Sequence, residues 1–235
     1  YSNEKYISTD INKAIYYLSL AANQNYKYAQ TNLGCIYYEG KLTQRDINKA
    51  IYYFSKSASQ NEPNAQYYLG VIYLEGKYIS RDIKKALKYL TLSAENEFRE
   101  SQQLLGDLYL EGKYVQKDIE VSIKYYKNVS SFYNQYAKNN LGVIYKNGFG
   151  VVKPNISLAK EYFREAISQK NDFLSKHNLA NILIEEDENN SKNYTESIKL
   201  LMETSFIQSQ ILLVLLLIKK NGYIDLNIIN NEFKY

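Results

Sequence analysis

The stretch Leu69–Leu90 reads LGVIYLEGKYISRDIKKALKYL, and two near copies of it stand elsewhere in the same chain. One copy, LGCIYYEGKLTQRDINKAIYYF, covers Leu33–Phe54, and the other, LGDLYLEGKYVQKDIEVSIKYY, covers Leu105–Tyr126. Each copy holds a glycine near the start of an otherwise helical pattern, where glycine costs about 1 kcal/mol relative to alanine. A glycine that recurs at this cost indicates a packing contact that leaves no room for a side chain.

The copies belong to a repeat with a period of 36 residues. The glycine inside the helical pattern recurs at Gly34, Gly70, Gly106 and Gly142. An aspartate recurs at Asp10, Asp46, Asp82 and Asp118. A fifth unit slips by one residue and has Asn155 at the aspartate position. Internal repetition at this period is typical of stacked helical repeats.

Each unit is predicted to hold two helices. The aspartate caps the start of a first helix of about 14 residues by accepting a backbone N–H bond. In the first unit, the apolar face is predicted to consist of Ala14, Tyr17, Leu18 and Ala21. A second helix follows, for example Ala65–Glu75, and Gly76 ends it in a left-handed conformation.

The glycine of the second helix is predicted to lie where a neighbouring helix comes close. Small residues of the first helices, on the same argument, share this role; they are Ala14, Ala50, Ala86 and Ala159. A single unit cannot bury its apolar face alone, so the units must stack. The fold class is therefore all-α, with antiparallel helix pairs.

At these residues the sequence resembles the Sel1-like repeat family, a relative of the tetratricopeptide repeat. The second helices carry AQTNLGCIYYEG, AQYYLGVIYLEG, SQQLLGDLYLEG and AKNNLGVIYKNG, and the first helices carry DINKAIYYLSLAA and DIKKALKYLTLSA. The resemblance implies a right-handed α-solenoid whose first helices line a concave face. It also implies a non-enzymatic adaptor for protein or peptide partners, with substrate recruitment in endoplasmic-reticulum-associated degradation as one role. The alternatives are a regulatory arm of a larger enzyme, such as a kinase, and a bacterial host-interaction protein.

The predicted organisation is one repeat domain over residues 1–235. Residues 1–9 are read as the end of a preceding repeat, so the chain is expected to be a piece of a longer protein. The units are 10–45, 46–81, 82–117, 118–154 and 155–193, and 194–235 form a degenerate capping unit. Ala180 stands at the glycine position of the fifth unit, and a weakening of the repeat pattern is expected near a terminal capping unit.

No catalytic constellation is visible, and no cofactor or metal is expected. His177, the only histidine, lacks partners at ligand spacing and is read as a surface or packing residue. Cys35 is read as a small packing residue, and the acidic run Glu185–Asn193 as a solvated, mobile loop. The apolar run Ile211–Ile218 is too short to span a membrane and is read as a buried last helix.

Partners are expected to be proteins or peptides. A net charge of +4 is too small to indicate nucleic acid. The candidate contact residues are lysines and tyrosines outside the apolar stripe of the first helices. They are Lys13, Tyr16, Lys49, Tyr52, Lys56, Lys85, Lys88 and Lys124. A solvated helix face is the competing interpretation, and the sequence leaves the compartment open between the endoplasmic reticulum lumen and the cytoplasm.

Overall fold

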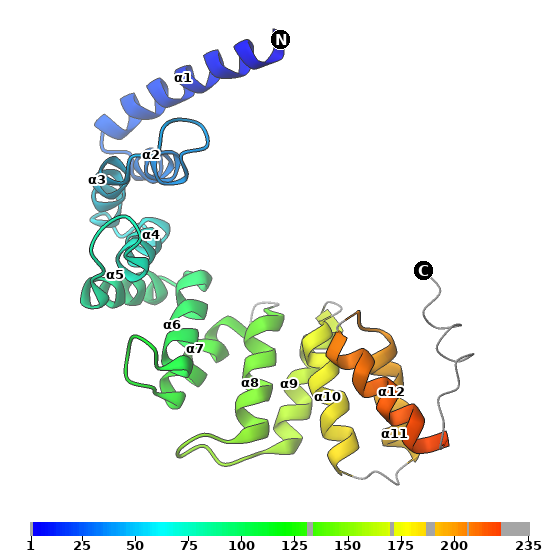
Figure 1. Ribbon diagram of the computed structural model, residues 1–235. Coiled ribbons are helices and arrows are strands. Elements are labelled where there is room, and N and C mark those ends of the chain that lie inside the picture. Colours follow the sequence, from blue (N-terminus) through cyan, green and yellow to red (C-terminus); the bar gives the residue numbers. More distant parts are fainter. Residues whose placement is uncertain (1, 131–133, 170–171, 187–190, 206, 222–235) are drawn as a thin grey trace. The chain divides into compact units, whose positions relative to one another are not determined.

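The computed structural model describes residues 2–130, 134–169, 172–186, 191–205 and 207–221, which form twelve helices joined without a strand (Figure 1). The chain divides into two compact units, residues 1–118 and 119–235. The first holds α1 (Ser2–Asn23), α2 (Lys27–Glu39), α3 (Ile47–Ala58), α4 (Pro63–Glu75), α5 (Ile83–Glu95) and α6 (Arg99–Glu111). The second holds α7 (Ile119–Ser130), α8 (Gln135–Asn147), α9 (Ile156–Gln169), α10 (Phe173–Glu186), α11 (Ser191–Met202) and α12 (Ile207–Asn221).

Helix starts and ends follow the sequence signals closely from the second repeat onwards. Asp46 and Asp82 each accept the backbone N–H three residues on, at 3.0 Å in both cases. Asn155 does the same for Leu158 at 2.9 Å. Gly76 ends α4 with φ of 62°, a left-handed value that costs other residues more than glycine. The predicted caps are therefore confirmed at these positions.

The first repeat departs from the prediction at its beginning. Residues 1–9 were expected to hold a helix end and a loop, with Asp10 as a cap, but α1 is continuous from Ser2 to Asn23. The reason lies in two missing signals. Glu4 occupies the position of the helix-ending Gly40, and Thr9 occupies that of Arg45. Arg45 holds the equivalent loop by donating to the carbonyls of Tyr38 and Glu39, both at 2.9 Å.

The glycine inside each second helix lies at a close helix contact, as predicted. A Cβ atom on Gly70 would lie 2.6 Å from Cγ of Leu90 on α5, and one on Gly34 would lie 2.5 Å from the Phe54 ring. The contact is thus small against large, whereas the sequence suggested small against small. Ala50, Ala86 and Ala159 are fully buried beside these contacts.

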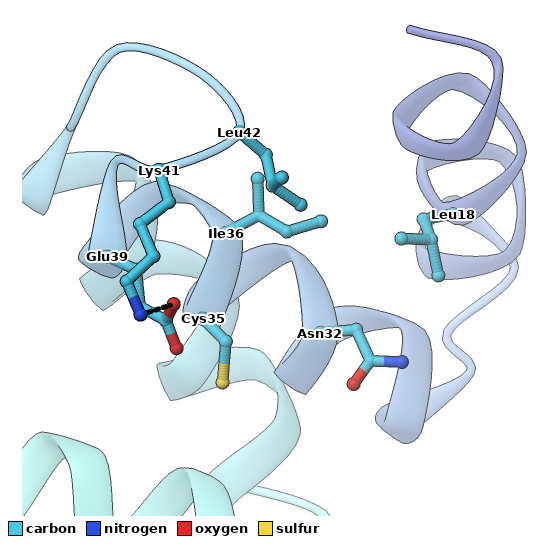
Figure 2. A pocket seen from close by; sticks show the side chains of 7 residues that line it. All are labelled: Leu18, Asn32, Cys35, Ile36, Glu39, Lys41 and Leu42. Carbon is cyan, nitrogen blue, oxygen red and sulfur yellow. Dashed lines mark ion pairs between the residues drawn. The ribbon is translucent and has the colours of Figure 1, made fainter. Parts of the chain in front are cut away.

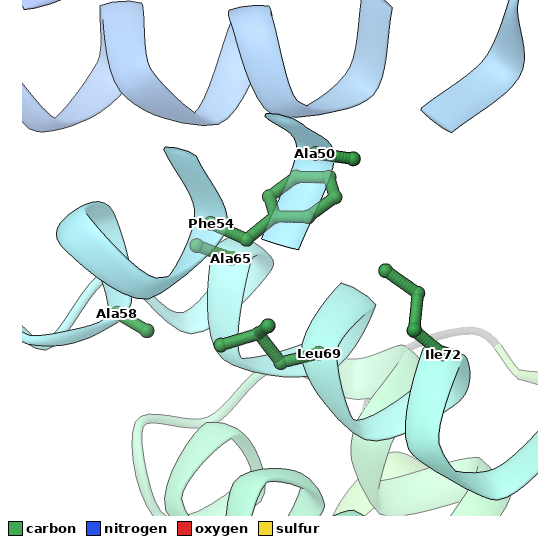
Figure 3. Close-up of a cluster of buried hydrophobic side chains, with 6 residues drawn as sticks. All are labelled: Ala50, Phe54, Ala58, Ala65, Leu69 and Ile72. Atoms are coloured by element: carbon green, nitrogen blue, oxygen red, sulfur yellow. The ribbon is translucent and has the colours of Figure 1, made fainter. Parts of the chain in front are cut away.

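Each pair of helices buries a small apolar cluster. Between α3 and α4 it consists of Ala50, Phe54, Ala58, Ala65, Leu69 and Ile72 (Figure 3). Tyrosines around the clusters stack in pairs at equivalent positions of successive repeats. Tyr37 stacks on Tyr53 with 3° between the ring planes, and Tyr73 stacks on Tyr89 with 7°. Such aromatic pairs add to the stability that area burial gives.

α1 buries only part of the predicted face, because Leu18 and Ala21 are packed as predicted and Ala14 and Tyr17 are not. Ile15, Leu18, Ala21 and Ala22 pack against α2, whereas Ala14 and Tyr17 are exposed. Helix α2 covers Ala50 and Tyr53, the equivalent residues of α3. Among the described residues no helix lies over Ala14 and Tyr17.

Candidate partner-binding surfaces

The predicted contact residues of the first three repeats lie on the exposed sides of α1, α3 and α5, within the first unit. Tyr16 is 60% exposed and Tyr52 is 52% exposed, so both rings are accessible to a partner. The lysines among them are exposed as well; they are Lys13, Lys49, Lys56, Lys85 and Lys88. Lys124 is exposed on α7, in the second unit.

Two of these lysines already have partners within the chain. The ammonium of Lys49 lies 3.6 Å from the carboxylate of Asp46 and 5.0 Å from the centroid of the Tyr37 ring. Lys85 makes the same contacts, at 3.3 Å from Asp82 and 5.1 Å from the centroid of Tyr73. The backbone N–H of Lys85, together with its ammonium, lowers the pKa of Asp82. These two lysines therefore reinforce helix starts, and their charge is less available to a partner.

Lys56 and Lys88 have neighbours of a different kind. The ammonium of Lys56 lies 4.7 Å from the centroid of Tyr52, and that of Lys88 lies 6.0 Å from the centroid of Tyr89. Within the described part of the chain, neither lysine forms an ion pair with a carboxylate. Cation–π contacts at exposed sites are worth only about 0.5–1 kcal/mol, so a partner can compete for both ammonium groups.

A second surface was not predicted. Glu39, Glu75 and Glu111 are the last residues of α2, α4 and α6, and all are exposed. Glu39 and Glu75 lie near an aromatic cluster in which Tyr68 packs on Tyr38 and Tyr67, with ring centroids 5.6 Å apart in both pairs. Burial raises the pKa of Tyr68, and the Cys35 thiol and Glu39 raise it further. The 36-residue spacing of the glutamates was the signal, but it was read only as part of a helix exit.

The second helices also make the direct contacts between neighbouring repeats. α2 touches α4 in the first unit and α8 touches α10 in the second, and no pair of first helices within the described part of a unit approaches as closely. In a curved stack of helix pairs, the helices on the inner side lie closest together. These contacts join α2 to α4 and α8 to α10 directly, and the placing of the first helices on the concave side stays a prediction of the family resemblance.

A pocket of about 330 Å³ opens between α1 and α2 (Figure 2). Its lining residues are Leu18, Asn32, Cys35, Ile36, Glu39, Lys41 and Leu42. The Lys41 ammonium pairs with Glu39 at 3.0 Å, away from Leu18 and Ile36, which face each other across the opening. Burial raises the pKa of the Cys35 thiol, so at neutral pH this cysteine is a protonated packing residue, as predicted.

In the second unit, charged side chains serve packing between helices. The acidic run Glu185–Asn193 was read as a solvated, mobile loop, but its first two residues end α10 and form ion pairs. Glu185 pairs with Lys146 at 3.0 Å, and Glu186 pairs with Lys160 at 2.7 Å. Residues 187–190 lie outside the described part.

Buried lysines, which the sequence reading missed, occur in the same unit. The Lys176 side chain is 2% exposed and its ammonium lies 2.7 Å from Glu203. Lys138 is 8% exposed and pairs with Glu165, also at 2.7 Å. Because a buried cation needs a paired anion, Glu165 is a structural partner of Lys138.

His177 and the apolar run also take structural roles. His177 Nδ1 lies 3.0 Å from the Ser209 hydroxyl, which joins α10 to α12, and Nε2 lies 3.0 Å from the amide of Asn181. Burial and then the charge of Lys146 lower the pKa of His177. The run Ile211–Ile218 lies in α12, where Leu213, Leu216 and Leu217 are buried but Ile211 and Leu215 are exposed. The last helix is thus buried on one side only.

The described residues hold neither a candidate metal site nor a candidate membrane span. They contain no cluster of three or more histidine, cysteine, aspartate or glutamate side chains that could hold a metal ion. None of the helices they form combines the length and the apolar character that crossing a membrane requires.

Comparison with known proteins fits the repeat geometry. The Sel1 repeat model matches residues 1–26, 27–62, 63–98, 99–128 and 135–171, and four of these matches begin at the first residues of α2, α4, α6 and α8. The chain therefore belongs to the Sel1 repeat family. Proteins of this family generally mediate protein–protein interaction and are in general non-enzymatic scaffolds.

Solved structures extend the likeness across most of the chain. The protective antigen c5321 of uropathogenic Escherichia coli, described as displaying an SLR fold, is 28% identical with a TM-score of 0.81. It aligns with 89% of this chain, which spans only 45% of that protein. A Sel1 repeat protein from Oxalobacter formigenes is 25% identical with a TM-score of 0.67, over 80% of this chain and 76% of its own. Among curated proteins, none matches.

Proposed function

We propose that this chain is a non-enzymatic scaffold that holds acidic protein segments against the exposed sides of α1, α3 and α5. The observation that carries the proposal is the exposure of Tyr16 and Tyr52 beside lysines that lack a carboxylate partner, Lys56 above all. Tyrosine supplies amphipathic contact area, and lysine steers an acidic partner during encounter.

The test reverses two charges without disturbing a helix start. The variant combines Lys56→Glu and Lys88→Glu, because Lys49 and Lys85 are tied to the capping aspartates. The matched control combines Lys77→Glu and Lys113→Glu, two exposed loop lysines that also lie near tyrosine rings. Both variants change the net charge by the same amount. A difference in binding between them therefore shows that the position of the lysines matters, and not the net charge alone.

Binding is measured with a fluorescent poly-glutamate peptide and, in parallel, with quantitative capture from a lysate at two salt concentrations. We expect the Lys56/Lys88 variant to lose at least fivefold in affinity at low salt, with a smaller loss at high salt because ions screen the attraction. Equal binding by the variant, the control and the unchanged chain would show that this surface does not bind acidic segments.

A second candidate rests on the acidic row Glu39, Glu75 and Glu111 beside the Tyr68 cluster. These side chains suit a basic peptide. Exchange of all three glutamates for lysine would then abolish binding of a poly-lysine probe and leave poly-glutamate binding to the other surface in place. Roles in endoplasmic-reticulum-associated degradation, in enzyme regulation or in host interaction stay predictions of the family resemblance.

A further inference from the structure

Three tyrosines of α2 and α4 form the aromatic cluster that lies near Glu39 and Glu75. Tyr68 packs on Tyr38 and on Tyr67, with ring centroids 5.6 Å apart in both pairs. All three tyrosines are half-buried, so each keeps part of its surface open to solvent. We name the three tyrosines and the two glutamates together the tyrosine–glutamate site.

Packing within the first unit holds these rings in place before a partner arrives. The ring of Tyr68 stacks on that of Phe54, with centroids 4.9 Å apart and 9° between the ring planes. The ring centroid of Tyr67 lies 5.4 Å from that of Phe98. An aromatic surface that is already fixed loses little conformational entropy when it binds. The cluster is therefore a preorganised contact surface.

The electrostatic surroundings of the cluster differ from those of the tyrosines on the first helices. Burial raises the pKa of Tyr38, and the charge of Glu75 raises it further. Burial also raises the pKa of Tyr53 on α3, but there the charges of Lys49 and Lys56 act in the opposite direction. A carboxylate beside an aromatic ring favours a cation over the ring face. The tyrosine–glutamate site is therefore suited to a positively charged group.

Both carboxylates of the site are available to a partner. Glu39 and Glu75 are exposed, and Glu75 forms no ion pair within the described part of the chain. Glu39 pairs with Lys41 at 3.0 Å (Figure 2), but the Lys41 side chain is 77% exposed. Because exposed ion pairs are worth only about 0–1 kcal/mol, an incoming cation can replace Lys41.

We infer that the tyrosine–glutamate site binds arginine side chains of an extended protein segment in preference to lysine side chains. The inference rests on the second candidate function, in which this surface takes a basic peptide. A guanidinium is planar, so it can stack on a tyrosine ring and also offer paired N–H donors to a carboxylate. A lysine ammonium is a compact, strongly hydrated charge and cannot make both contacts in this way.

The experiment compares three fluorescent peptides that differ only at their basic positions. Every third residue of a Gly/Ser background is arginine, lysine or citrulline, the uncharged isostere of arginine. This spacing suits the site, because α2 contacts α4 and packed helices lie about 8–10 Å apart, close to three extended residues at about 3.3 Å each. We expect the full chain to bind the arginine peptide at least about fivefold more tightly than the lysine peptide, and not to bind the citrulline peptide.

Two pairs of variants of the full chain locate the binding. Glu75→Gln should weaken binding of the arginine peptide at least about threefold. Glu95→Gln, the same charge change at the exposed end of α5, should leave it nearly unchanged. Tyr38→Leu should bring the ratio of the arginine and lysine affinities close to one, whereas Tyr38→Phe keeps the ring and should keep the ratio.

The affinity ratio separates recognition from folding. If Tyr38→Leu merely loosened the packing against Tyr68, both basic peptides would bind more weakly and the ratio would stay the same. Circular dichroism checks that each variant is folded.

Three results would overturn the inference. Equal affinities for the arginine and lysine peptides would show that the site recognises charge alone, and the second candidate function would still stand. Binding of neither peptide would remove that function together with the inference. An arginine preference that survives both Glu75→Gln and Tyr38→Leu would place the guanidinium groups elsewhere on the chain.

Discussion

Equivalent faces of α3 and α1, which lie 36 residues apart, share one sequence pattern but differ in burial. Ala50 is 0% exposed under α2, whereas its counterpart Ala14 is exposed. Tyr53 is half-buried in a stack with Tyr37, whereas Tyr17 is 66% exposed. The difference teaches that the pattern specifies a surface able to pack, and that a neighbouring helix decides whether the surface is packed.

The largest effect is expected from filling a covered contact. Gly70→Leu should destabilise the first unit by at least about 1–3 kcal/mol, because overpacking outweighs the gain of about 1 kcal/mol in helix propensity. The reason is the 2.6 Å that would separate a Cβ atom at this position from Cγ of Leu90. Thermal unfolding monitored by circular dichroism measures the change.

A compensating substitution sharpens this test. Leu90→Ala in the same chain should restore part of the stability lost in Gly70→Leu, because it empties the space that the new side chain needs. Equal melting temperatures for Gly70→Leu and the unchanged chain would contradict the close approach.

An intermediate effect is expected from the same substitution on the equivalent faces of α3 and α1. Ala50→Leu should cost about 1–3 kcal/mol because the residue is fully buried against α2 and α4. Ala14→Leu, the same exchange one repeat earlier, should stay within about 0.5 kcal/mol, because its side chain is exposed. Chemical denaturation of both variants gives the difference, and a similar loss in both would mean that α1 is covered in solution.

The smallest effect is expected at the helix starts. Asp82→Ala removes the bond from the Lys85 N–H and should lower the melting temperature by about 2–4 °C. Asp10→Ala should change it little, because Asp10 lies within α1 and begins no helix. A loss at Asp10 that equals the loss at Asp82 would show that a helix begins there after all.

The pH dependence of the Asp82 effect has a defined sign. The pKa of Asp82 is lowered in the folded chain, so its contribution is fully present above the unfolded value of about 3.9 and is lost as pH falls through the folded pKa. The difference in melting temperature between the unchanged chain and Asp82→Ala should therefore shrink on acidification. A difference that grows at low pH would contradict this assignment.

The surfaces show where reasoning from one sequence falls short. The lysine and tyrosine positions were correctly placed outside the core at Tyr16, Tyr52 and Lys56. The same reasoning treated Lys49 and Lys85 as free charges, because it did not consider that a capping aspartate lies within reach three residues earlier. It also missed the exposed glutamates that end α2, α4 and α6.

The sequence by itself determined the repeat period of 36 residues, the capping residues at Asp46 and Asp82, the left-handed end at Gly76 and the close contact at Gly70. These features depend on local backbone geometry or recur every 36 residues, so one chain displays them several times over. Only the tertiary structure decided that Ala14 and Tyr17 are exposed, that Lys176 is buried against Glu203 and that Glu185 pairs with Lys146. Burial and ion pairing depend on which distant segment lies opposite a side chain, and no local pattern encodes that segment.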